Sequence, residues 1–260
     1  ECSAMSLKYL GQHFDIHGGG IDLKFPHHES EVLQTECHTN HSPMANYWLH
    51  SGHLTINNEK MSKSLDNFFL VRDVMKEYSA SVLRFYLLNG HYRSPIDFSD
   101  SNLDESVSAY KRLEGVFNRL KSATKSGDKM PDELIQALDS CYSDFSKAMN
   151  DDFNTREALA VLFQFSRFVN GYELDTLAND LQSNLMELFS ILGGEVLGLF
   201  TKKEVDLKFQ AKIENLIRQR NEARSAKDWS KSDAIRDELT ELGVEIQDTS
   251  DGTTWNLTNI

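Results

Sequence analysis

Two lysines stand three positions apart in the segment EKMSKSLDN, residues 59–67. Between Lys60 and Lys63 there are only one methionine and one serine. Lysine side chains are flexible point charges that bind phosphates, and such charges stabilise the negative charge that develops on a departing phosphate group. The segment therefore predicts a loop that closes on phosphates, although a solvated basic turn fits the same pattern and is more common.

A second set of residues combines a thiol, an imidazole and a carboxylate. His27 and Glu31 are four positions apart, so they share one face if the segment is helical, and Cys2 is the thiol that a strand-to-helix fold can bring close. Three such ligands with one open position suit a zinc ion that receives a substrate. His28 is an alternative ligand. From spacing alone, a surface His–Glu pair beside a buried cysteine is the simpler interpretation.

The segment HGGGID carries His17, three glycines and Asp22. Glycines allow a backbone to approach a nucleotide closely, and an acid just beyond them can bind a ribose hydroxyl. The segment lacks the dinucleotide fingerprint G-x-G-x-x-G. A tight turn therefore explains it about as well as a nucleotide site.

Near the C-terminal end, the segment RQRNEARSAKDW places basic residues beside Trp229. Arginines near an exposed aromatic ring suit stacking on unpaired RNA bases. An amphipathic helix with Trp229 in the core explains the same pattern, and it is the better interpretation without context.

Residues 1 to about 55 must position the first three motifs. FDIHGGGIDLKF indicates a strand that runs into a glycine turn, PHHESEVLQTECH a helix that Pro26 opens, and YWLHSGHLTI another strand. A strand, a helix and a second strand predict a parallel α/β piece. Cys2 and Met5 resemble interior residues, so we expect the sequence to begin inside a fold.

Beyond Asn67 the apolar residues recur at helical spacing, which predicts a helical bundle. Asn154, with Glu157 three positions on, is typical of a helix start. LQSNLMELFSILGGEVLGLF indicates a helix that stops at Gly-Gly. The last segment predicts two helices that break near Lys227–Asp228, followed by a hairpin with Asp-Gly at its turn.

Composition limits the functional classes. The chain has 260 residues, a net charge of −13 and three cysteines. No apolar run is long enough to span a membrane, no signal peptide is evident, and the odd, widely spaced cysteines favour a reducing cytoplasm. The net charge argues against non-specific binding of nucleic acid but permits a local basic face that reads one structured RNA.

In these motifs the chain resembles the cysteinyl-tRNA synthetases, which are class I aminoacyl-tRNA synthetases. The resemblance rests on ECSAMS, FDIHGGGIDLKFPHHESE, EKMSKSLDNFF, LRFYLLNGHYRSPIDFS and KDWSKSDAIRDEL…DTSDGTTW, in the order of that family. The lysine loop is common to many class I synthetases. The Cys…His-His-Glu-x-Glu arrangement with HGGG is far more specific to the cysteine enzymes.

The resemblance implies ligation of cysteine to its cognate tRNA, with ATP and magnesium, through a cysteinyl-adenylate. It implies that zinc selects the substrate thiol over a serine hydroxyl. The implied site residues are listed by role: Cys2, His27 and Glu31 as zinc ligands; Lys60, Lys63 and His17 as catalytic residues; Lys63, Asp22, Gly19 and Gly20 as ATP contacts; and Arg224, Trp229, Asp233 and Asp248 as tRNA contacts.

The resemblance also implies the organisation of the chain. We expect an α/β class, in which a partial Rossmann-like catalytic piece is followed by an α-helical bundle and a small α+β module. The expected boundaries are 1–66 for the catalytic piece with the zinc site and lysine loop, 67–103 for a connecting stem-contact region, 104–200 for a tRNA-binding bundle, and 205–260 for an anticodon-binding module. We expect a cytoplasmic monomer that binds tRNA, cysteine and ATP and no membrane.

Two family features lie upstream of any residue present here: a fourth zinc ligand, which is a cysteine, and a His-Ile-Gly-His type motif that holds ATP. Ser30 also stands where the family more often has asparagine. The resemblance therefore implies that this chain alone activates cysteine weakly or not at all.

Two other functions remain open. The chain could be a non-catalytic tRNA-binding protein, against which the intact lysine loop and ligand positions argue. It could also be a ligase that couples cysteine to an amino sugar through the same adenylate. Such enzymes lack the anticodon module that DTSDGTTWNL and the preceding helix pair indicate.

Overall fold

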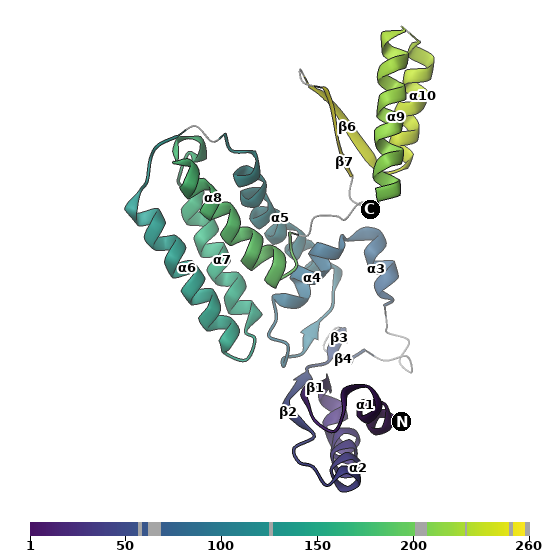
Figure 1. Ribbon diagram of the computed structural model, residues 1–260, viewed down its shortest axis with the longest axis vertical. Coiled ribbons are helices and arrows are strands. Elements are labelled where there is room, and N and C mark those ends of the chain that lie inside the picture. Colours follow the sequence, from purple (N-terminus) through teal and green to yellow (C-terminus); the bar gives the residue numbers. More distant parts are fainter. Residues whose placement is uncertain are drawn as a thin grey trace. The chain divides into compact units, whose positions relative to one another are not determined.

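The computed structural model describes residues 1–56, 59–61, 69–124, 127–200, 207–226, 228–249 and 252–257. The chain divides into two compact units, one of Glu1–Leu70 with Ala80–Phe200 and one of Val71–Ser79 with Thr201–Ile260. Figure 1 traces the elements in chain order. The domain boundaries expected from the sequence stay predictions.

The first elements form a small α/β piece. They are α1 (Cys2–Leu10), β1 (Phe14–Gly20), two helical turns (Ile21–Leu23 and Lys24–His28), α2 (Glu29–Thr39) and β2 (Ala45–Ser51). β1 pairs with β2 in parallel, with His17 opposite Trp48 and Gly19 opposite His50. α1 contacts α2, where the Ser3 hydroxyl donates a 2.8 Å hydrogen bond to the Gln34 side chain.

Three local expectations for this piece were wrong. The glycines Gly18–Gly20 belong to β1 and not to a turn, because strand pairing brings the Leu49 carbonyl so close to Gly18 that a Cβ would lie 2.7 Å from it. The predicted strand at YWLHSGHLTI is two strands, β2 and β3 (Leu54–Ile56). Cys2 and Met5 are exposed and not interior, with Met5 at 59%.

A second small sheet follows the α/β piece. β3 pairs in parallel with β5 (Ile96–Asp97) and antiparallel with β4 (Glu59–Lys60). Two helices follow β4 in the chain: α3 (Val71–Glu77), which belongs to the second compact unit, and α4 (Ala80–Leu88), which belongs to the same unit as the sheet. The Tyr86 hydroxyl donates a 2.8 Å hydrogen bond to the Asp97 carbonyl, which holds β5 beside α4.

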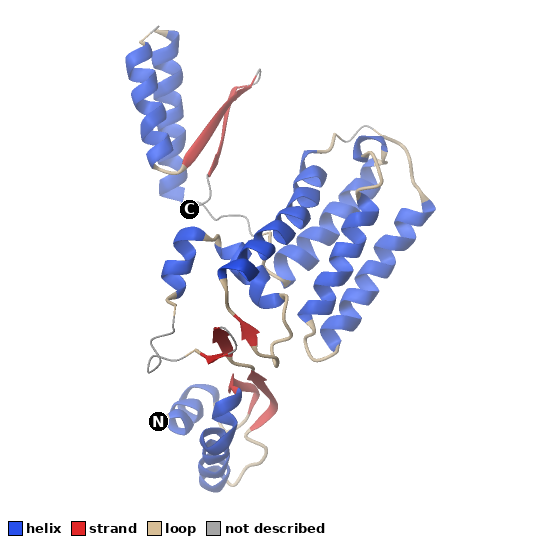
Figure 2. Ribbon diagram, turned by 180° about the vertical axis from the view of Figure 1, so that it is seen from behind, coloured by secondary structure: helices blue, strands red, loops and turns tan. Residues whose placement is uncertain are grey.

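Four helices make the bundle: α5 (Asp100–Ser122), α6 (Asp132–Asn150), α7 (Thr155–Val169) and α8 (Asn179–Leu188). They are the largest helical group in Figures 1 and 2. Their apolar faces supply most of the core, including Leu113, Leu162 and Leu185, each fully buried. The Asn154 side chain caps α7 by accepting from the Glu157 backbone N–H at 3.2 Å, as predicted.

The predicted stop at Gly-Gly was wrong. Helical backbone continues from α8 through the segment Phe189–Val196, past both glycines. Gly193 is required by packing, because a Cβ there would lie 2.3 Å from the Phe200 ring. The reversal occurs at Gly198, whose φ of 67° is accessible to glycine at little cost.

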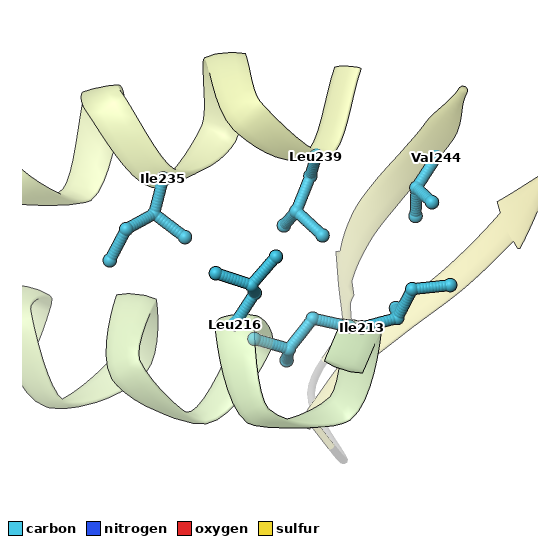
Figure 3. Close-up of a cluster of buried hydrophobic side chains, with 6 residues drawn as sticks. Ile213, Leu216, Ile235, Leu239 and Val244 are labelled. Carbon is cyan, nitrogen blue, oxygen red and sulfur yellow. The ribbon is translucent and has the colours of Figure 1, made fainter. Parts of the chain in front are cut away.

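The C-terminal module consists of α9 (Leu207–Ser225), α10 (Trp229–Glu241), β6 (Val244–Thr249) and β7 (Gly252–Leu257). β6 and β7 form the predicted antiparallel hairpin, and its Asp-Gly turn falls partly outside the described residues. Figure 3 shows the module's core, where α9 and α10 bring Leu216, Ile235 and Leu239 together beside Val244 of β6. This is a self-contained apolar core.

The architecture confirms the predicted class of an α/β piece followed by a helical bundle and a small α+β module. Among the described residues, no helix is both long enough and apolar enough to cross a membrane.

Candidate metal centre and active-site face

The three predicted zinc ligands converge. One ligand atom each of Cys2, His27 and Glu31 lies within 4.8 Å of the other two. Cys2 begins α1, which the Ser3–Gln34 hydrogen bond holds against α2, and Glu31 lies in the first turn of α2. The contact between these two helices therefore brings together ligands that are 29 positions apart in sequence.

Glu31 is the buried member of the centre. It is 3% exposed, whereas Cys2 and His27 are exposed. The alternative of a surface His–Glu pair beside a buried cysteine is therefore not what is found, because the carboxylate is buried and the thiol is exposed. A carboxylate that is removed from water needs a cation or several hydrogen bonds to offset its lost hydration, so the position requires positive charge nearby.

Two imidazoles approach the two oxygens of Glu31. Nε2 of His27 lies 3.1 Å from Oε1, and Nε2 of His17 lies 2.7 Å from Oε2. The His17 contact has the distance of an ion pair but not the alignment of a hydrogen bond, since Oε2 accepts none among the described residues. A buried carboxylate with an unfilled oxygen, beside a thiol and imidazoles, fits a zinc ion.

His28, the alternative ligand, belongs to a second set. It forms a group with His17 and Glu31 whose ligand atoms also lie within 4.8 Å of one another. Its Nδ1 is engaged with Nε2 of His50 at 2.8 Å. Both sets share Glu31, and only the first contains a sulfur ligand.

The face of the β1–β2 sheet next to the centre is lined with rings. His17 and Trp48, opposite each other in register, have ring centroids 4.8 Å apart, and His28 lies 5.3 Å from Trp48. Gly19 allows His28 to sit there, because a Cβ at Gly19 would lie 3.1 Å from its ring. These contacts give Gly19 a structural role in addition to the ATP contact expected from the sequence.

The inner histidines of this face carry little positive charge near neutral pH. Burial, followed by the nearby His17, lowers the pKa of His28 below its ordinary value. Burial, followed by the charges of Lys24 and Arg93, lowers the pKa of His50. Between two neutral imidazoles, one ring nitrogen donates and the other accepts, so the pair forms a fixed, uncharged wall.

Sequence reasoning missed Trp48 and His50. The signal was available, since residues two apart in a strand point to the same face, and YWLHS has an aromatic ring and an imidazole at that spacing. Assigning that face to the site required the register of β1 against β2.

The remaining predicted site residues are placed as follows. Asp22 lies exposed in the turn Ile21–Leu23. The backbone of Lys60 pairs with Thr55 in the β3–β4 ladder, whereas Lys63 lies outside the described residues. The lysine loop is therefore anchored at its N-terminal end by a strand.

The predicted tRNA contacts gather on the C-terminal module. Arg224 near the end of α9 and Trp229 at the start of α10 are exposed, with Trp229 at 59% and not in the core. Asp233 is exposed one turn after Trp229. The backbone of Asp248 lies in β6, and the structure describes the backbone but not the side chain of this residue.

Family models match most of the chain in order. Residues 1–108 match the tRNA synthetases class I (C) catalytic domain, residues 144–201 the DALR domain, and residues 207–255 the cysteinyl-tRNA ligase anticodon binding domain. The last match is to the module that the amino-sugar ligases lack, so it counts against that alternative.

Curated relatives agree with the family models. The chain is 47% identical to a cysteine–tRNA ligase of Histophilus somni (strain 2336) and 46% identical to one of Klebsiella pneumoniae subsp. pneumoniae, in each case over 98% of this chain and 54% of the relative. The chain thus spans about half the length of the curated relatives it matches.

A solved structure supports the fold. It is the ternary complex of Agrobacterium radiobacter K84 agnB2 LeuRS with tRNA and LeuAMS, with a TM-score of 0.55 and 21% identity over 71% of this chain and 26% of that chain. This likeness shows a shared fold alone. The conclusion about the family rests on the three family models in order and on the identity to curated relatives: the chain belongs to the cysteinyl-tRNA synthetase family.

Proposed function

We propose that the chain contributes to an enzyme that ligates cysteine to its cognate tRNA, using ATP and passing through a cysteinyl-adenylate. The observation that carries this proposal is the convergence of Cys2, His27 and Glu31 within 4.8 Å around a buried carboxylate. Family membership supplies the reaction class, and the ligand set supplies the basis for choosing cysteine.

Cys2, His27 and Glu31 would hold zinc. When bound, zinc supplies a soft Lewis acid that prefers a thiolate to a hydroxyl. Such a preference rejects serine without a separate editing site, whereas an apolar pocket discriminates poorly against an isostere that bears a hydroxyl. His17, 2.7 Å from the second oxygen of Glu31, would fix the orientation of that carboxylate.

The remaining roles concern ATP with magnesium. Gly19 and Gly20 would let the backbone approach the nucleotide, and Asp22 would bind the ribose. Lys60 and Lys63 would stabilise the negative charge that develops as pyrophosphate departs. The neutral pair His28 and His50 would form the uncharged wall beside the amino acid.

The tRNA contacts are assigned to the C-terminal module. Arg224 and Trp229, both exposed, would bind and stack on unpaired anticodon bases, with Asp233 and Asp248 accepting hydrogen bonds from base edges. We further propose that residues 1–66 act in catalysis, 67–103 and 104–200 contact the tRNA body, and 205–260 bind the anticodon.

The first test is the zinc content of the purified chain by elemental analysis. We expect about one zinc per chain, lost in His27→Ala and retained in His38→Ala, because His38 is an exposed histidine of α2, the helix that carries Glu31, and lies outside both ligand sets. Equal zinc in the two variants would contradict the assignment.

The second test is cysteine-dependent ATP–pyrophosphate exchange by a protein extended to the length of its relatives. We expect exchange with cysteine, at least about a hundredfold less with serine, and a loss of exchange in Lys63→Ala. Comparable exchange with both amino acids would refute selection through the thiol.

A further inference from the structure

A cavity of about 960 Å³ lies between α5 and α7, beside the end of α4, and belongs to neither the metal centre nor the C-terminal module. Its charged lining is entirely basic: Lys111, Arg112 and Arg119 from α5, and Arg156 and Arg167 from α7. The chain as a whole has 27 basic and 40 acidic residues. A lining with five basic residues and no acidic residue is therefore far more positive than the chain's average composition. The cavity therefore selects for negative charge.

Among the residues that the structure describes, protein carboxylates do not neutralise these cations. Across the described ranges, none of the five is in an ion pair. Arg112 lies over the Phe163 ring at 5.8 Å, and Arg119 donates to the Asn170 side chain and the Tyr172 carbonyl. All five side chains are exposed at the rim, so they are available to an anionic ligand.

A buried hydroxyl in the lining provides an independent observation. Ser166 of α7 is 4% exposed, and its Oγ has no hydrogen-bond partner among the described residues. Other helical serines bond to the carbonyl four residues back, as Ser106 and Ser183 do at 2.9 Å. Buried hydroxyls normally have a hydrogen-bond partner. The Ser166 hydroxyl is therefore available to form a hydrogen bond with a ligand.

The floor of the cavity is apolar and partly aromatic. Val116 and Leu159 are buried there, and the Phe163 ring is half-buried below Arg112. Gly115 and Ala160 leave the space open, and a Cβ at Gly115 would meet nothing within 4 Å. An aromatic face beside a guanidinium suits a planar base, and the volume is at the upper end for small-molecule sites.

We propose that this cavity binds a nucleotide, with the base against Phe163 and Leu159 and the phosphate among the basic residues of α5 and α7. The Ser166 hydroxyl forms a hydrogen bond with the nucleotide. A free mononucleotide and a single nucleotide of an RNA chain present the same chemistry. A site for a free mononucleotide goes beyond the proposed function, whereas a site for a nucleotide of RNA rests on the proposed contact of residues 104–200 with tRNA and names where that contact is made.

The test is calorimetric titration of the full chain with AMP, and separately with a cysteine tRNA transcript. Gly115→Leu places a bulky side chain in the cavity, and Gly115→Ala is its matched control. Arg156→Glu and Arg167→Glu, made singly and together, reverse the rim charge, and Lys147→Glu on α6, outside the cavity lining, is the charge-matched control for each single variant. Ser166→Ala removes the unpartnered hydroxyl.

We expect Gly115→Leu and the charge-reversed double variant to weaken binding about tenfold or more, and Ser166→Ala to weaken it severalfold. Gly115→Ala and Lys147→Glu should bind as the parent does. An effect on AMP identifies a free mononucleotide as the ligand. An effect on the transcript alone, with the salt slope reduced by about one for each lost phosphate contact, identifies RNA.

The proposal is overturned if neither probe responds to Gly115→Leu or to the charge-reversed pair, or if Lys147→Glu weakens binding equally. The charge-reversed positions are exposed, so that variant tests the cavity even if Gly115→Leu fails to fold. Zinc content reports on the proposed function separately and should be unchanged in every variant.

Discussion

The three cysteines differ in exposure. Cys2 and Cys37 are exposed, whereas Cys141 is buried in α6. Burial, with a smaller contribution from Asp144, raises the pKa of the Cys141 thiol to about 12. Because the thiolate is the reactive form, both the burial of Cys141 and its raised pKa protect it from modification.

Alkylation of the folded chain with iodoacetamide should therefore modify Cys2 and Cys37 and spare Cys141. Adding zinc should slow modification of Cys2 at least about tenfold, because a bound thiolate is no longer a free nucleophile. Cys37 serves as the internal control. Peptide mass spectrometry over time would measure all three rates, and equal protection of Cys2 and Cys37 would contradict the metal assignment.

Asp152 connects the bundle to the loop after α4. It accepts hydrogen bonds from Arg93 and, at 2.7 Å, from the Tyr92 hydroxyl. The Arg93 guanidinium, followed by the Tyr92 hydroxyl, lowers the pKa of Asp152 to about 2. Since the folded pKa is below the unfolded value, the interaction stabilises the fold above about pH 4 and is lost as the pH falls toward 2.

Asp152→Asn should therefore lower the melting temperature at pH 7, with a difference from the parent that closes between about pH 4 and pH 2. Asparagine tolerates the positive φ of 54° at this position, so the variant tests charge and not backbone strain. Thermal melts across this pH range, with Asp151→Asn as the neighbouring control, measure the effect. A constant difference down to pH 2 would show that the carboxylate charge is not responsible.

At the scale of elements, the sequence predicted helix faces better than glycine roles. The apolar spacing beyond Asn67 predicted helices, and in α5 residues of that spacing, Tyr110, Leu113 and Val116, are buried, because a helix repeat is a local property. Gly18 was misassigned to a turn and Gly193 to a helix stop. Their roles depend on Leu49 and Phe200, which only the folded chain brings close.

Two glycines in helical segments offer a matched comparison. Gly193→Ala should destabilise the fold by about 1–3 kcal/mol, because its Cβ would overlap the Phe200 ring. Phe200 cannot yield easily, since its ring is stacked on Phe117 at 4.5 Å. Gly115→Ala should stabilise by up to about 1 kcal/mol, because its Cβ enters open space and alanine favours the helix.

Urea denaturation of both variants would measure this contrast. The sign of the effect is the diagnostic quantity, since the chemical change is the same. Destabilisation of similar size in both would mean that helix propensity and local space do not govern these positions.

The residues of the candidate site also fall into two groups: those predicted from local sequence and those whose role depends on contacts between distant segments. Ligand spacing within one helix indicated His27 and Glu31, and the sequence resemblance added Cys2. The role of Trp48 and His50 depends on which strand lies beside β1 and in which register. No periodicity within a single segment contains that information.

At the scale of the whole molecule, the two compact units have separate cores. Leu239 is fully buried in the core of the C-terminal module, and Leu162 is fully buried in the bundle. A core Leu→Ala change typically costs about 2–5 kcal/mol. The two substitutions should therefore report on different units.

Calorimetry should resolve two unfolding transitions in the full chain. Leu239→Ala should lower the transition of the C-terminal module and leave the other unchanged, and Leu162→Ala should do the reverse. A single transition that both variants shift equally would show that the units unfold as one.

The β1–β2 sheet has a further consequence for backbone protection. Among the described strands, β1 and β2 pair only with each other, and Ile16 and Tyr47, on the face away from the histidines, are 56% and 68% exposed. The inward-facing amides of each strand should resist hydrogen–deuterium exchange, whereas the amides on the outer edges should exchange quickly. If a further strand paired with either outer edge, the amides on that edge would become protected from exchange.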